Sequence, residues 1–325
     1  MSSPVRRVAA ASAGLVVAAG AGLGAQRVVA KRLRRRPDPD AGDDWELPFD
    51  EQRLVPSHDE GSINVFSRGA GQPIVMSHGV LLTAQTWVKQ FRTFPELGFR
   101  AVAFDHRGHG GSTCGTDGHT VDTLASDVRT VLEALDLRDA ILVGHSMGGV
   151  AVEAFCIRFP EVAAERVAGI VLMSTLARSV IGGHERMASA MTRLAQHSPD
   201  GTPLLGTPNL GLVLTRFGFG KDPQPSHIEL TRRMLLSCDR ETRRDSPASL
   251  IGLELSPVLA KIAVPTLVMC GTADRLTPLA ESRRIAECIP NARLAVLEGG
   301  GHMLMLEQAQ RVDELITKFA VQGEV

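Results

Sequence analysis

The sequence feature that most constrains the fold is a G-x-S-x-G pattern at residues 144–148, directly after the apolar run at residues 140–143. A buried strand that ends in this pattern is typical of a nucleophile elbow, a tight strand-to-helix turn that exposes the serine hydroxyl. Glycines on both sides of the serine allow two backbone segments to approach closely and permit strained torsions. The pattern nominates Ser146 as a nucleophile and raises the question of which residues supply its base, its acid and its oxyanion donors.

Strand-like and helix-like segments alternate from about residue 47 onward, which predicts a largely parallel α/β sheet. Strands are expected at residues 62–67 (an edge strand), 73–77, 100–104, 140–144, 167–173, 266–270 and 292–297, and helices at residues 83–97, 121–135 and 148–159. The alternation breaks between about residues 176 and 260, where prolines, glycines and arginine pairs interrupt short helical pieces. We interpret this stretch as an inserted cap over the carboxyl edge of the sheet, where open α/β sheets bind ligands.

These patterns divide the chain into an N-terminal segment at residues 1–45, a core at residues 46–175 and 261–325, and the cap at residues 176–260. Residues 8–26 carry no charge and are rich in alanine, glycine and valine, and a basic cluster follows them. Three interpretations compete: a weak membrane anchor, a cleaved signal peptide, and a partly helical or disordered tail. The basic cluster disfavours export, because positive charge tends to stay on the cytoplasmic side. We therefore expect a cytoplasmic protein, and membrane association through residues 8–36 stays open.

Composition excludes several classes of partner. The net charge of −1 gives no reason to expect nucleic acid. The five cysteines are widely spaced and form no C-x-x-C pair, so neither a disulfide framework nor a zinc site is indicated. Residues 36–44 are rich in proline and acidic residues and are interpreted as a linker.

A serine nucleophile requires a base, because its hydroxyl reacts poorly until a neighbouring group accepts the proton. His302 follows three glycines after the last expected strand, and such a loop can return a histidine over the sheet edge. Asp274 follows the expected strand at residues 266–270, where a carboxylate can orient the imidazole and stabilise its charged form. The order serine, acid, histidine is the one found in this architecture.

Two backbone N–H groups are expected to stabilise the oxyanion. Met147 N–H lies at the start of the helix after the elbow, and Val80 N–H lies in the loop after His78-Gly79. The charged and histidine residues at 105–109 are interpreted as bracing for a loop, without a part in the chemistry.

Five segments, in this order, carry a resemblance to a known family: residues 78–80, 105–112, 144–149, 271–275 and 301–303. The chain resembles the α/β-hydrolase-fold serine hydrolases, which include lipases, esterases, cofactor-free haloperoxidases and carbon–carbon bond hydrolases. The resemblance implies a mostly parallel eight-stranded sheet flanked by helices, with an inserted and mainly helical cap. It implies the triad Ser146, Asp274 and His302, with no metal and no organic cofactor. Ser146 argues against the members that use an aspartate nucleophile, namely epoxide hydrolases and haloalkane dehalogenases.

The leading functional hypothesis is hydrolysis of a small carboxylic ester through an acyl-enzyme, with a short or medium acyl chain or a monoacylglycerol as substrate. An apolar acyl group is expected because the cap holds many leucines and phenylalanines between residues 204 and 219. The same triad would serve hydrolysis of a carbon–carbon bond, a thioester or a lactone, or cofactor-free perhydrolysis. A non-catalytic ligand-binding protein on this fold is the alternative from another class. The exact substrate and the oligomeric state do not follow from the sequence.

Overall fold

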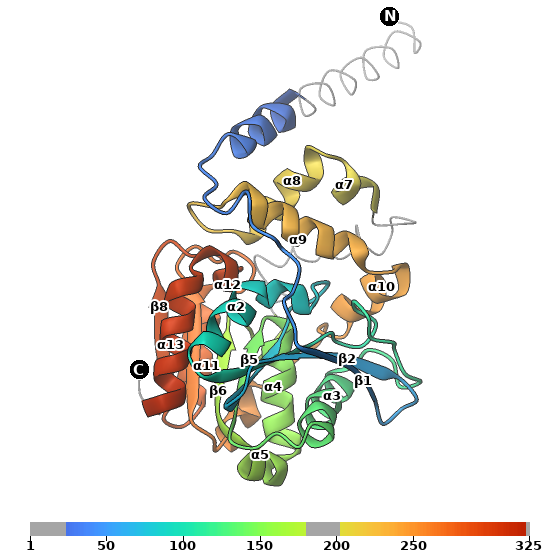
Figure 1. Ribbon diagram of the computed structural model, residues 1–325, viewed down its shortest axis with the longest axis vertical. Helices are drawn as coiled ribbons and strands as arrows, with labels where there is room; N and C mark the ends of the chain where they lie inside the picture. The colour runs from blue at the N-terminus through green and yellow to red at the C-terminus, as the bar shows by residue number, and fades with distance from the viewer. Residues whose placement is uncertain (1–23, 180–201, 323–325) are drawn as a thin grey trace, which may run out of the picture.

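The computed structural model describes residues 24–179 and 202–322, and its architecture is a central sheet with helices on both faces (Figure 1). Within these residues the sheet has eight strands in the order β1-β2-β4-β3-β5-β6-β7-β8. The strands are β1 (Glu51–Pro56), β2 (Ser62–Arg68), β3 (Gln72–Ser77), β4 (Phe99–Phe104), β5 (Ala140–His145), β6 (Val167–Met173), β7 (Thr266–Gly271) and β8 (Arg293–Leu297). Only the β1–β2 and β2–β4 pairs are antiparallel. The predicted eight-stranded, mostly parallel sheet is therefore confirmed.

The central strands are apolar throughout because both faces of the sheet are covered. All six residues of β5 are buried, as expected for a parallel strand between two helical layers. Alternate side chains enter different cores: in β3, Ile74 and Met76 join one apolar cluster and Val75 joins the other. This alternation gives the sheet a core on each face.

Helices cover both faces, and their ends follow ordinary capping rules. Thr120 begins α3 (Val121–Ala134) with a capping box completed by Thr123. The remaining core helices are α2 (Val88–Glu96), α4 (Met147–Arg158), α5 (Pro160–Arg166), α11 (Leu279–Cys288), α12 (Leu304–Glu307) and α13 (Ala309–Gln322), with 3-10 helices η1 (Ala84–Trp87) and η3 (Ser256–Lys261). The helix expected at residues 83–97 is thus divided into η1 and α2.

The sheet edge differs from the expectation. The strand expected at the edge, residues 62–67, lies second, because β1 pairs outside it along its whole length. The sequence pattern did not indicate β1, since Val55 is its only buried residue. Pairing of backbone groups with β2, and not a buried apolar face, holds this strand in place.

The stretch between β6 and β7 is helical where it is described, and we call residues 202–255 the insert. It contains α7 (Thr202–Gly206), α8 (Leu210–Thr215), η2 (Arg216–Gly218), α9 (Pro225–Ser237) and α10 (Arg240–Ala248). These helices lie together beyond one end of the sheet strands (Figure 1). The part of the predicted cap at residues 180–201 lies outside the described residues.

An N-terminal arm, residues 34–46, joins the insert to the core. Asp40 accepts hydrogen bonds from His227 of α9 (2.7 Å) and Lys89 of α2 (2.5 Å). Further contacts join Arg34 to Asn209, Arg36 to Asp222 and Asp38 to Ser226. The composition of residues 36–44 predicts a linker, whereas the structure gives most of this segment specific partners on two separate elements.

Residues 24–34, just before the arm, are helical and run above the insert (Figure 1). Ala30 and Leu33 are buried in the same apolar cluster as Leu212 of α8. Most of the uncharged run at residues 8–26 lies outside the described residues. Among the residues that are described, no helix combines the length and the apolar character needed to cross a bilayer.

Candidate active site

Ser146 occupies the sharp turn between β5 and α4. Its backbone has φ 53° and ψ −120°, a conformation that non-glycine residues rarely adopt. Such strain persists only where the surroundings enforce it, and it is typical of functional sites. The turn brings the serine to the carboxyl edge of the sheet, at the start of a helix.

Close backbone packing around Ser146 requires two of the glycines. A Cβ atom on Gly148 would lie 2.2 Å from the carbonyl oxygen of Ser77, at the end of β3. A Cβ atom on Gly79 would lie 3.1 Å from the Cβ of Ser146 and 2.9 Å from Nδ1 of His145. The loop after β3 therefore lies directly against the elbow, where the second oxyanion donor is expected.

Asp274 and His302 are brought together from two different loops, after β7 and after β8. Asp274 Oδ2 lies 3.0 Å from His302 Nδ1. The other oxygen, Oδ1, accepts the N–H groups of Leu276 and Thr277, each at 2.9 Å. Both side chains are buried, so the carboxylate is held in one orientation towards the imidazole.

The ionised state of Asp274 fixes the tautomer of His302. Burial alone would raise the pKa of Asp274, but His302 and the hydrogen bonds from Thr277 outweigh burial and lower it below the ordinary value of 3.8. Asp274 is therefore an anion that only accepts, and Nδ1 of His302 carries the proton in this hydrogen bond. Nε2 of His302 is left to accept a proton from another group.

The neighbour of Ser146 in the chain links the elbow to the histidine loop. His145 Nε2 donates to the carbonyl oxygen of His302 at 2.9 Å, and the two rings are 4.7 Å apart. In the described part of the chain no hydrogen bond joins Ser146 Oγ to the His302 imidazole. Such bonds are often loose in unliganded sites and tighten when substrate binds.

The two expected oxyanion donors, Val80 and Met147, both belong to backbone that meets at the elbow. Met147 is the first residue of α4, whose free N–H groups point towards the site. Val80 follows Gly79, which packs on Ser146. Among the described residues, neither N–H has a backbone acceptor, so both are available to a ligand.

Two further residues support this site, and the sequence reasoning did not nominate them. Thr277 Oγ1 donates to Asp274 Oδ2 at 2.8 Å, completing a turn that a D-x-x-T pattern could have suggested. Glu307, from α12, accepts the N–H groups of Gly301 and Met303, each at 3.1 Å, and so holds the loop that carries His302. Nothing in the local sequence signals this second contact.

The bracing predicted for residues 105–109 has a clear geometric basis. Asp105 accepts the N–H of Ala84 at 2.8 Å and the N–H of Gly111 at 2.9 Å. Arg107 is buried between Asp59 and Asp127, with ion pairs of 2.8 Å and 2.7 Å. These contacts tie the loop after β4 to the loops on both sides of it.

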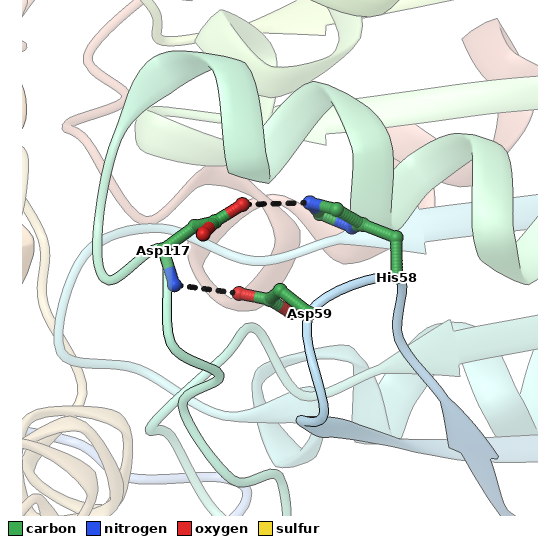
Figure 2. A group of neighbouring side chains, drawn as sticks. All are labelled: His58, Asp59 and Asp117. Atoms are coloured by element: carbon green, nitrogen blue, oxygen red, sulfur yellow. Dashed lines mark hydrogen bonds and ion pairs between the residues drawn. The ribbon is translucent and has the colours of Figure 1, made fainter.

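One group of described residues has the proximity needed to share a metal ion: His58, Asp59 and Asp117, whose candidate ligand atoms all lie within 4.8 Å of one another (Figure 2). Asp59, however, already accepts from the Arg107 guanidinium and from Ser57 Oγ. A cation here would share its carboxylate with a fixed positive charge 2.8 Å away. The donor set therefore fits an ion-paired loop better than a metal centre.

Comparisons with known proteins agree with this fold. A family model described as alpha/beta hydrolase fold matches residues 72–309. The non-heme chloroperoxidase CPO-A1 of Kitasatospora aureofaciens is 31% identical over 251 residues, which cover 72% of this chain and 86% of that protein. The bifunctional esterase/perhydrolase DCH of Acinetobacter calcoaceticus is 28% identical over 265 residues, with 76% and 90% covered. The solved structure of the esterase EaEST from Exiguobacterium antarcticum matches with a TM-score of 0.74 and 24% identity, over 83% of this chain and 99% of that one.

Proposed function

Because the chain belongs to the alpha/beta hydrolase fold family and is an enzyme of the hydrolase type, we propose that it hydrolyses small carboxylic esters through an acyl-enzyme. The observation that carries the proposal is the 3.0 Å contact between Asp274 and His302 beside the Ser146 elbow. The apolar side chains of the insert favour a short or medium acyl chain, or a monoacylglycerol. In this proposal the insert acts as the cap of the site.

Each of these residues has a distinct role in the proposed reaction. Ser146 Oγ attacks the ester carbonyl while Nε2 of His302 takes its proton, and Asp274 stabilises the imidazolium that forms. The N–H groups of Val80 and Met147 stabilise the oxyanion. His302 then protonates the departing alcohol. Water attacks the acyl-enzyme, gives its proton to His302, and releases the carboxylic acid and free Ser146.

The test is hydrolysis of p-nitrophenyl esters of graded chain length. Ser146→Ala should lower kcat by about a thousandfold or more, because the residual rate of such variants comes from binding and the oxyanion donors alone. Ser126→Ala is the matched control, since this partly exposed serine lies on α3 and its hydroxyl, within the part of the chain that the structure describes, donates to the carbonyl of Asp122. Undiminished turnover in the Ser146→Ala variant would show that Ser146 is not the nucleophile.

A binding role without catalysis is separated by covalent labelling. A fluorophosphonate should add once to the wild-type chain, at Ser146, and not to the Ser146→Ala variant. An intact protein mass with no adduct, under conditions where the chain is folded, would favour the ligand-binding alternative.

Perhydrolysis is a second candidate activity, favoured by the names of the chloroperoxidase and esterase/perhydrolase relatives. Hydrogen peroxide would replace water in the second step, cleaving the Ser146 ester and releasing a peracid that oxidises bromide. The assay is bromination of a dye in acetate buffer with peroxide. Activity that persists in Ser146→Ala would show that the bromination does not use this site.

We also propose that the N-terminal segment brings the enzyme to a membrane surface. Residues 8–26 are uncharged, and the helix at residues 24–34 leaves Arg27, Lys31 and Arg32 exposed. Basic side chains near a bilayer attract anionic lipid by about 1 kcal/mol each, and a positive flank would keep the core in the cytoplasm. The full chain should sediment with phosphatidylglycerol vesicles, and deleting residues 8–26 should weaken this binding. Equal recovery of both chains in the supernatant would contradict the proposal.

A further inference from the structure

His109 is a buried histidine that contacts the loop of Val80, and its hydrogen bonds fix its tautomer. Its Nδ1 lies 2.9 Å from the carbonyl oxygen of Arg107. A carbonyl only accepts, so Nδ1 carries the proton and Nε2 is the acceptor. Burial also lowers the pKa of His109 to about 3, so the ring stays neutral at ordinary pH.

The acceptor of His109 is used by the loop that carries Val80. Leu81 N–H donates to Nε2 of His109 at 3.2 Å. Leu81 has φ 58°, a left-handed conformation that a branched apolar residue adopts only when it is held there. The Leu81 N–H belongs to the peptide on the carbonyl side of Val80, so this hydrogen bond restrains ψ of Val80 and thereby the course of the loop that carries the Val80 N–H.

The insert reaches the same histidine. Ser246 of α10 is buried, and its Oγ lies 3.4 Å from His109 Nε2 and 3.3 Å from Sδ of Met147. Met147 is the second proposed donor residue. One turn earlier in α10, Thr242 Oγ1 donates to the carbonyl oxygen of Gly108 at 2.8 Å. One face of α10 therefore contacts Gly108, His109 and Met147.

We propose that His109 is a positioning residue of the oxyanion hole, and that Ser246 joins it to the insert. The inference rests on the proposed function, since it concerns the same reaction. His109 does not exchange a proton with substrate in this scheme. It orients the Val80 side of the hole, while Ser246, whose single hydroxyl proton can go to His109 Nε2 or to Met147 Sδ, connects these two residues to α10.

The variants His109→Leu and His109→Gln test this role. In His109→Leu the acceptor for Leu81 N–H is absent, and kcat should fall about 10- to 100-fold while KM changes by less than about twofold, because misplacing a donor weakens transition-state binding selectively. The glutamine amide can both donate and accept, so His109→Gln should recover at least about tenfold of this loss. The pH dependence of kcat/KM should keep its shape in both variants.

Two further variants complete the design. Ser246→Ala should lower kcat about 3- to 10-fold, less than His109→Leu, since the contact of His109 with Leu81 survives. His58→Gln is the control, a substitution of an exposed histidine in the loop after β1, whose Nε2 lies 3.6 Å from Asp117. Circular dichroism and thermal unfolding establish that each variant is folded.

Unchanged kcat in folded His109→Leu, or equal losses in the leucine and glutamine variants, would overturn the inference. If His109→Leu does not fold, Ser246→Ala decides the test: wild-type kcat in the folded Ser246→Ala variant would overturn the inference, whether or not KM changes. These outcomes leave the proposed function intact as long as Ser146→Ala is inactive. Full ester turnover by Ser146→Ala would instead mark failure of the proposed function itself.

Discussion

Arg107 offers the sharpest test of how this structure is held together. Its guanidinium is buried and makes a two-pronged contact with Asp127, at 2.7 Å and 2.8 Å. It also contacts Asp59 at 2.8 Å and 3.4 Å and donates to the carbonyl of Gly118 at 2.9 Å. Replacing Arg107 with methionine would leave two buried carboxylates with no opposing charge.

The expected loss is about 3–5 kcal/mol in the free energy of unfolding at pH 7, the range found when one partner of a buried ion pair is removed. The loss should depend on pH. Burial would raise the pKa of Asp59, but hydrogen bonds from Arg107 and Ser57 outweigh it and hold the pKa below 3.8. Wild-type Asp59 thus stabilises the fold above pH 3.8, and this stability is lost as pH falls through its lowered pKa. Without Arg107 the carboxylates favour protonation, so the deficit should shrink between pH 7 and pH 5.

Urea unfolding followed by circular dichroism, at both pH values, measures these differences. Arg311→Met is the control, because Arg311 forms an exposed pair with Glu314 and should change stability by less than about 1 kcal/mol. Adding Asp59→Asn and Asp127→Asn to Arg107→Met should recover part of the loss. A loss below about 1 kcal/mol, or no recovery in the triple variant, would refute the reasoning that links the loss to uncompensated charge.

Three further predictions concern buried groups. Gly79→Ala should lower kcat at least about tenfold in the ester assay, because its Cβ would lie 2.9 Å from His145 Nδ1 and 3.1 Å from Ser146 Cβ; wild-type kcat would contradict the packing argument. Glu153→Met should raise the free energy of unfolding by about 1–3 kcal/mol, since neither carboxyl oxygen has a partner among the described residues. Burial raises the pKa of Glu153, so this group lowers the free energy of unfolding of the wild type as pH rises above 4.5. The stability gained by Glu153→Met should therefore grow with pH, and a destabilised variant would contradict the reasoning. Burial lowers the pKa of His78 from 6.5 to about 4. Between pH 7.5 and pH 5 this group should therefore lower the free energy of unfolding of the wild type by about 2 kcal/mol. Urea unfolding of His78→Gln should show a decrease smaller by about 2 kcal/mol over the same pH range.

The sheet and the contact between Asp274 and His302 could be predicted because both follow from local patterns. Apolar runs such as β5 indicate parallel strands buried on two faces. In a parallel sheet, the residues that follow each strand gather at the carboxyl edge. Short motifs after β7 and β8 were therefore enough to predict the contact between Asp274 and His302, and the motif after β5 predicted the sharp turn at Ser146.

Features that depend on distant partners were not predictable. β1 has a single buried residue, so only its backbone pairing with β2 marks it as a strand. Glu307 supports the His302 loop by accepting hydrogen bonds from the N–H groups of Gly301 and Met303. No short sequence pattern predicts this contact. The acidic residues of the N-terminal arm resemble a solvated linker until their partners in the insert are known.

That arm has a consequence for how the protein can be divided. Asp38 bonds to Ser226, 188 positions later in the chain, and Asp40 reaches both α9 and α2. A recombinant chain trimmed to the family-matched residues 72–309 would lose the arm, together with β1 and β2. A chimaera that exchanges the insert with that of a relative would need residues 34–46 from the same parent. The arm and the insert therefore form one structural unit for such exchanges, although residues 47–201 separate them in the chain.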